Sequence, residues 1–165
     1  MILQLRIESK LYNGIVTVQN AHAVSAKMIL LANDELAGND LMKKSTMAQA
    51  DPEFNVQIRG IQETSRLLAD PRAEKLMVQI ICTSPRDAAA LLENLGKTEV
   101  VVGKYKAKKA ENKLELNSSW VVAQEDVPYW ERLYELSGGH LYGQVLSEHP
   151  KQDFLKLLQK AKKCD

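Results

Sequence analysis

Short apolar runs alternate along this chain with segments whose apolar residues recur at helical spacing. The runs predict strands over residues 2–7, 28–32, 56–58, 76–82, 100–102, 114–116 with 120–122, and 141–145. Strands that are apolar on both faces and separated by helices are typical of parallel sheets covered on both sides. We therefore predict an α/β fold with a mainly parallel central sheet and helices on both faces.

The clearest helical segment runs from Pro85 to Leu95. Ser84 is suited to cap its N-terminus, Pro85 fits the first helical position, and Gly96 is suited to end it. Two later helices are predicted from apolar stripes, one at Val127, Trp130, Leu133 and Tyr134 and the other at Phe154, Leu157, Leu158 and Ala161. The breaks between segments are too short for domain linkers, so residues 1–165 are expected to form a single domain.

The composition excludes several classes of protein. A chain of 165 residues can bury a sizeable core without disulfides or metals. Its 22 Lys and Arg nearly cancel its 21 Asp and Glu, so no global charge attracts nucleic acid or an anionic membrane. No signal peptide or membrane span is recognisable, and Cys82 and Cys164 show no pairing pattern. We expect a cytoplasmic protein with reduced thiols.

Motifs for metals and common cofactors are missing from the sequence. No cluster of His, Cys or carboxylate residues has metal-ligand spacing, and no Gly-x-Gly-x-x-Gly or Walker-type sequence follows the first strand. We therefore predict no metal site and no cofactor.

A binding site is expected where the predicted parallel strands end. Ligands of open parallel sheets bind at the carboxyl ends of the strands, where the loops converge. The first of these loops leads into a helix, and with Lys10 and the permissive Gly14 it presents backbone N–H donors and positive charge to a phosphate. Asn33 and Asp34 follow the second strand, where ligand contact and capping of the next helix are both open.

The first loop also resembles a known signature. Residues 6–16 read Arg-Ile-Glu-Ser-Lys-Leu-Tyr-Asn-Gly-Ile-Val, and subunits IIB of the mannose/sorbose family of the sugar phosphotransferase system read close to Arg-Ile-Asp-Asp-Arg-Leu-Ile-His-Gly-Gln-Val. In that family the His carries the phosphoryl group. Here Asn13 holds that place, Ser9 replaces the second Asp and Lys10 replaces the second Arg, whereas Arg6 and Gly14 agree.

The resemblance continues along the chain. Asn33 to Ala37 is similar to the stretch after the family's second strand, and Val100 to Gly103 is similar to the strand before its Gly-Gly turn, whose second Gly is Lys104 here. Trp120 to Val127 is similar to the strand and acidic helix start that follow. The resemblance implies the IIB architecture and a set of phosphate- or partner-binding residues: Arg6, Ser9, Lys10, Asn13, Gly14, Asn33, Asp34, Gly103 and Lys104.

Asn13 decides the functional hypothesis. An amide nitrogen shares its lone pair with the carbonyl and cannot replace the imidazole as a nucleophile, so no catalytic residue is assigned and enzymatic activity stays open. Because several neighbours of Asn13 also depart from the signature, natural degeneracy is favoured over an engineered change. The resemblance implies docking on IIA and on membrane subunits IIC and IID, with membrane association only through these partners. We predict a non-phosphorylatable binding or regulatory IIB-like paralogue.

Two alternatives remain at this point. One is an active IIB subunit in which another group has taken over, and the other is an unrelated flavodoxin-like domain that binds a small anion. The basic run from Lys104 to Lys109 contains Tyr105, yet a solvated loop is favoured over nucleic-acid binding. The oligomeric state, including a homo-oligomer, stays open.

The other histidines and the large apolar side chains have structural interpretations. His22 is expected to be a partly buried packing residue, whereas His140 and His149 lie in turn contexts. Core packing is expected for the largest apolar side chains considered as surface candidates, Trp120, Trp130, Met42 and Met47.

Overall fold

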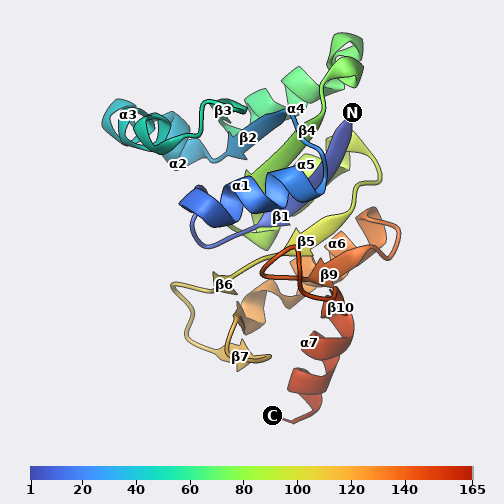
Figure 1. The fold of residues 1–165 in the computed structure, drawn as a ribbon. Coiled ribbons are helices and arrows are strands. Elements are labelled where there is room, and N and C mark those ends of the chain that lie inside the picture. Colours follow the sequence, from blue (N-terminus) through green and yellow to red (C-terminus); the bar gives the residue numbers. More distant parts are fainter. Residues whose placement is uncertain (165) are drawn as a thin grey trace.

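The computed structural model describes residues 1–164 and has a seven-stranded central sheet in the order β10-β9-β5-β1-β4-β2-β3 (Figure 1). Neighbouring strands are parallel except β10, which is antiparallel to β9. The strands are β1 (Ile2–Ile7), β2 (Met28–Ala32), β3 (Asn55–Arg59), β4 (Val78–Cys82), β5 (Val100–Val102), β9 (Leu141–Gly143) and β10 (Gln152–Asp153). The predicted fold class is confirmed.

Helices cover both faces of the sheet (Figure 1). They are α1 (Gly14–Ala23), α2 (Asp34–Ala37), α3 (Asp40–Gln49), α4 (Ile61–Ala69), α5 (Pro85–Leu95), α6 (Val127–Leu136) and α7 (Phe154–Lys163), with short 3-10 turns at Pro71–Lys75 and Gln124–Asp126. Because side chains alternate along a strand, Leu30 of β2 packs with α4 and α5, whereas Ile29 and Leu31 pack with α1 and α2. Helix α3 differs from the others, because none of its residues is buried.

A small second sheet stands beside the central one. It consists of β6 (Tyr105–Lys106), β8 (Trp120–Ala123) and β7 (Lys113–Glu115), in the order β6-β8-β7. An aromatic cluster joins this sheet to the helices, since the ring centroids of Trp120 and Phe154 lie 5.8 Å apart and those of Tyr105 and Trp130 lie 5.6 Å apart. The second sheet is therefore part of the same core.

The predicted elements differ from the structure mainly at their ends. Strand β4 begins at Val78, because Leu76 caps the preceding 3-10 turn, and β9 ends at Gly143. The predicted strands at 114–116 and 120–122 belong to the second sheet. The two-residue strands β6 and β10 were not predicted, since two residues carry no recognisable pattern. Helix α5 has the predicted bounds.

Within residues 1–164, every helix is too short or too polar to cross a membrane.

Candidate functional site

Three loops meet at the carboxyl edge of the central sheet, around the end of β1. Strand β1 lies between β4 and β5, so the loop after it contacts the loops of both neighbours. The Glu8 N–H donates to Cys82 O at 2.9 Å and the Ser9 N–H donates to Lys104 O at 2.9 Å. The Ser9 hydroxyl accepts from the Lys106 N–H at 2.9 Å. The first loop is thus held by backbone bonds on both sides.

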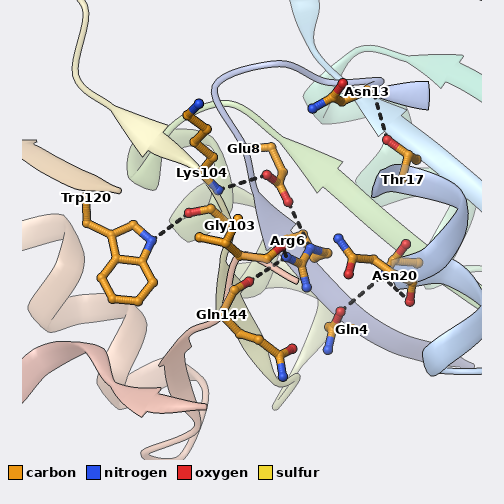
Figure 2. A network of polar contacts seen from close by, with 12 residues as sticks. Gln4, Arg6, Glu8, Asn13, Thr17, Asn20, Gly103, Lys104, Trp120 and Gln144 are labelled. Atoms are coloured by element: carbon orange, nitrogen blue, oxygen red, sulfur yellow. Dashed lines mark hydrogen bonds and ion pairs between the residues drawn. The ribbon is translucent and has the colours of Figure 1, made fainter. Parts of the chain in front are cut away.

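Arg6 anchors this arrangement from inside the protein (Figure 2). Arg6 is only 1% exposed. Its guanidinium donates to Glu8 Oε2 at 3.0 Å and to Gln144 O at 2.7 Å. A second carboxylate oxygen of Glu8 accepts from the Lys104 N–H at 3.1 Å. Arg6, predicted among the binding residues, therefore points inward and holds Glu8.

Glu8 and Gly103 are packed tightly together. A Cβ on Gly103 would lie 2.0 Å from Glu8 Oε2, so only glycine leaves room for the carboxylate. Burial raises the pKa of Glu8 above its ordinary value, and the nearby Arg6 guanidinium opposes that rise. The Gly103 carbonyl in turn accepts from Trp120 Nε1 at 2.7 Å, which ties the site to the second sheet (Figure 2).

Asn13 lies at the end of the first loop, where α1 begins (Figure 2). Its backbone N–H donates to Thr17 Oγ1 at 2.7 Å, and its exposed side chain makes no capping bond. Gly14 has a φ of +38°, a conformation that favours glycine. Within residues 1–164, no acceptor is bonded to the N–H groups of Gly14 and Ile15. An amide side chain and two unpaired backbone donors are therefore available next to each other.

A hollow of about 460 Å³ opens beside Asn13, and we call it the lysine hollow. Its lining also contains Glu8, Ser9 and Ala107. None of its lysines forms an ion pair with a described residue. Like charges this close together favour an anion between them. The lysines of the hollow are Lys10, Lys104, Lys106, Lys108 and Lys113.

The sequence analysis identified two of these lysines as site residues, Lys10 and Lys104. A further signal was available in the basic run, because Tyr105 and Ala107 are buried whereas Lys106 and Lys108 are exposed. This alternation with a period of two is typical of an extended segment, and it turns the lysines to one side. Lys113 lies in β7, and no pattern in the neighbouring sequence indicates that it lines the hollow.

A second hollow of about 540 Å³ lies next to the lysine hollow, and we call it the polar hollow. Asn33 lines it, with its side-chain oxygen accepting from the Leu36 N–H at 2.8 Å and its amide donating to Thr83 Oγ1 at 3.3 Å. Asp34 lines neither hollow, because its carboxylate accepts from the Ile61 N–H at 2.8 Å. Both residues therefore serve as caps, and Asn33 also faces the site.

Comparison with known proteins supplies the family. The sequence model of the PTS system sorbose subfamily IIB component matches residues 2–165. The chain belongs to this family. It is therefore a IIB component of a mannose/sorbose-type phosphotransferase system (PTS), which removes the alternative of an unrelated flavodoxin-like domain.

Individual relatives agree with this assignment. The IIB chain is 25% identical over 162 residues to a "Probable phosphotransferase enzyme IIB component" from Streptococcus pyogenes, with 96% of this chain and 99% of the relative covered. It is 24% identical over 159 residues to the mannose-specific EIIAB component of Escherichia coli, of which it spans 48%.

Solved structures share the fold of this IIB component. The IIB domain of the sorbose permease from Klebsiella pneumoniae superposes with a TM-score of 0.87 at 19% identity, covering 96% of each chain. The N-acetylgalactosamine-specific IIB component 1 from Escherichia coli gives a TM-score of 0.80 at 22% identity, covering 92% of this chain and 98% of the other.

The histidines of this IIB component line neither hollow. His22, predicted to be partly buried, is exposed, because its neighbour Ala21 faces the sheet instead. It lies 3.1 Å from Glu53 and edge-on to Phe54. His140 bonds to the Tyr142 hydroxyl at 3.0 Å.

Of the large apolar side chains, the two tryptophans are buried as predicted. The prediction for Met42 and Met47 was wrong, because α3 buries nothing and leaves them 43% and 44% exposed. Within residues 1–164, no group of three or more His, Cys, Asp or Glu side chains is placed to hold a metal.

Proposed function

We propose that this chain is a non-phosphorylatable IIB component, which binds its partner subunits in the phosphotransferase system without relaying the phosphoryl group. The observation that carries the proposal is Asn13. It lies in the lysine hollow, at the place where the family signature has the carrier His. The lysines and the backbone donors of Gly14 and Ile15 remain suited to hold a phosphoryl group. The acceptor for that group is what has been lost.

Other nucleophilic groups of the first loop and of the end of β4 support the proposal, because they are bonded elsewhere or buried. The Glu8 carboxylate is bonded to Arg6 and Lys104, and the Ser9 hydroxyl accepts from the Lys106 N–H. Cys82 is buried, and burial raises the pKa of its thiol far above its usual range, so a thiolate does not form at neutral pH. These contacts make Glu8, Ser9 and Cys82 poor acceptors for a phosphoryl group, whereas the charged lysines can still attract one.

By family membership, the proposed partners are IIA and the membrane subunits IIC and IID. A phosphoryl group carried by IIA is anionic, and the lysine hollow has the charge to attract it. In this function the chain works on the cytoplasmic side and reaches the membrane only through its partners.

A phosphorylation assay tests the proposal. The chain is incubated with the upstream phosphotransferase proteins, IIA and radiolabelled phosphoenolpyruvate, and acid-labile protein phosphate is measured. We expect no label on the wild type and gain of label on Asn13→His. Gln19→His is the matched control, because it adds a histidine to an exposed position of the same helix outside both hollows.

Stoichiometric labelling of the wild type would contradict the proposal and support the alternative of an active IIB subunit that uses another group. Binding is measured separately, with immobilised IIA in its phosphorylated and unphosphorylated forms. We expect tighter binding to the phosphorylated form, and a preference that Lys106→Ala and Lys108→Ala reduce.

A further inference from the structure

Asn13 and Gly14 form the one Asn-Gly dipeptide of the chain. In such a pair the backbone nitrogen of the glycine can attack the side-chain carbonyl carbon of the asparagine, because glycine has no Cβ to hinder the approach. A bond forms between Gly14 N and Asn13 Cγ, the bond from Cγ to Nδ2 breaks, and the N–H proton passes through solvent to the departing ammonia. Water then opens the cyclic imide at either carbonyl, which leaves aspartate or isoaspartate.

The two groups that react are free of hydrogen bonds within residues 1–164. The Asn13 side chain is exposed and makes no capping bond (Figure 2), and the Gly14 N–H has no acceptor. For the ring to close, the peptide plane between them must turn from the Asn13 ψ of 67°. This turn loosens the bonds that the Asn13 carbonyl accepts from the N–H groups of Val16 and Thr17. Those bonds belong to the first turn of α1, and helix ends fray.

The lysine hollow favours the attack electrostatically. The backbone nitrogen must lose its proton before it attacks, and negative charge then moves to the side-chain oxygen of Asn13. Asn13 lines the hollow together with its lysines, among them Lys10 and Lys104. Positive charges at the place where an anion develops stabilise the transition state. The site therefore combines a free nucleophile, a free amide and a cationic surrounding.

Other asparagines of the chain lack this combination. Asn117 is followed by a small residue, but its Oδ1 accepts from the Ser119 N–H at 2.8 Å and from the Trp120 N–H at 3.1 Å. Asn112 is exposed, but the long side chain of Lys113 follows it. These two positions serve as internal references, since each shares one feature of Asn13 and lacks another.

We propose that Asn13 is a site of spontaneous deamidation, at which the chain slowly converts its own neutral amide into a carboxylate. The product places a negative charge in the lysine hollow and weakens its attraction for an anionic phosphoryl group. The covalent step needs only water and is independent of the proposed function, whereas its effect on docking of phosphorylated IIA rests on that function. Docking then declines with the age of the chain.

Peptide mass mapping of the full chain tests the covalent step. The protein is kept for several days in mildly alkaline buffer, with a parallel sample in guanidinium chloride, and isoaspartate is labelled with isoaspartate methyltransferase. We expect Asn13 to convert faster than any other asparagine of the folded chain, at a rate within about tenfold of that in denaturant. Asn117 should convert more than about tenfold more slowly in the folded chain than in denaturant, because its hydrogen bonds hold it.

Two variants identify the mechanism. Asn13→Gln keeps an amide but must close a larger ring that forms more slowly, so conversion at this position should fall below detection. Gly14→Ala adds a side chain beside the attacking nitrogen and should slow conversion of Asn13. Because Gly14 has a φ of +38°, Gly14→Ala can also disturb the start of α1, and Asn13→Gln retains the glycine for that reason.

The effect on docking is measured with immobilised phosphorylated IIA. Asn13→Asp, which reproduces one product of the reaction, should bind about fivefold more weakly than the freshly prepared wild type. Gln19→Glu is the matched control, because it adds the same charge at an exposed position of α1 outside both hollows. We expect this control to bind like the wild type.

Two results would overturn the proposal. One is conversion of Asn13 in the folded chain that is no faster than conversion of Asn117 and Asn112, and the other is equal docking of Asn13→Asp and the wild type. A wild type that does not dock on phosphorylated IIA at all would count against the proposed function alone, because mass mapping reports on Asn13 without any partner.

Discussion

Glu8 and Gly103 compete for the same space at the centre of the site. A Cβ at position 103 would lie 2.0 Å from Glu8 Oε2, so Gly103→Ala must displace the carboxylate from Arg6. Because Arg6 is buried, loss of its ion partner costs on the order of 3 kcal/mol. We expect the variant to lose about that much free energy of unfolding in urea titration.

Glu8→Asp provides the comparison for this variant. The shorter side chain vacates the space beside position 103, so the double variant with Gly103→Ala should lose less stability than the two single changes added together. Simple additivity would show that the two residues do not restrict one another.

Protonation of Glu8 gives a second prediction for this residue. Its pKa is raised by burial above the ordinary value of 4.5, so the folded protein holds the proton more tightly than the unfolded chain does. Stability from this group is fully present below pH 4.5 and declines as the pH rises through the folded pKa. In the Glu8→Gln variant this decline should be missing from the unfolding free energy measured at pH values above 4.5. An identical pH profile for both proteins would contradict the raised pKa.

Helix caps differ in what they stabilise. Ser84 Oγ accepts from the Asp87 N–H at 3.1 Å at the start of α5, a helix with five buried residues. Asn39 Oδ1 accepts from the Met42 N–H at 3.0 Å at the start of α3, which buries none. We expect Ser84→Ala to lower the global free energy of unfolding by about 1 kcal/mol. Asn39→Ala should instead speed hydrogen exchange in α3 and change the global value little.

Helices and strands could be predicted from the sequence where the pattern of apolar, capping and turn residues extends over several positions. Strand β2 and helix α5 have the predicted bounds, since an apolar run marks the first and Ser84, Pro85 and Gly96 mark the second. Helix α3 was not recognised as exposed, because Met42 and Met47 read as core residues when only their type is considered. Packing of a helix depends on its place in the fold, which periodicity alone does not give.

The candidate site was predictable only in part for a similar reason. Lys10 and Asn13 were identified from the first loop, and Lys104 from the resemblance of the stretch after Val100 to the family's Gly-Gly turn. All three line one hollow. The inward direction of Arg6 depends on the Gln144 carbonyl, 138 residues away along the chain. Lys113 reaches the hollow through pairing of β7 with β8. Such long-range contacts leave no local pattern in the sequence.

Variants of Trp120 and Trp130 can test how the second sheet is joined to the rest of the molecule. Both side chains are buried, but Trp120 Nε1 donates to Gly103 O at 2.7 Å, whereas Trp130 Nε1 has no acceptor among the described residues. Replacing either by Phe removes a similar volume from the core. Only Trp120→Phe also leaves a buried carbonyl without its donor, at a cost of about 1 to 3 kcal/mol.

We therefore expect Trp120→Phe to lose more free energy of unfolding in urea than Trp130→Phe. Since Gly103 also borders Glu8, the loss of this bond should loosen the loop that carries Lys104 and Lys106, and hydrogen exchange there should be faster in Trp120→Phe than in Trp130→Phe. Equal stability of the two variants, with equal exchange in the loop, would mean that the second sheet is held by aromatic packing alone. The chain has no tryptophan besides these two, so each variant leaves a single fluorophore that reports on the other position during the same titration.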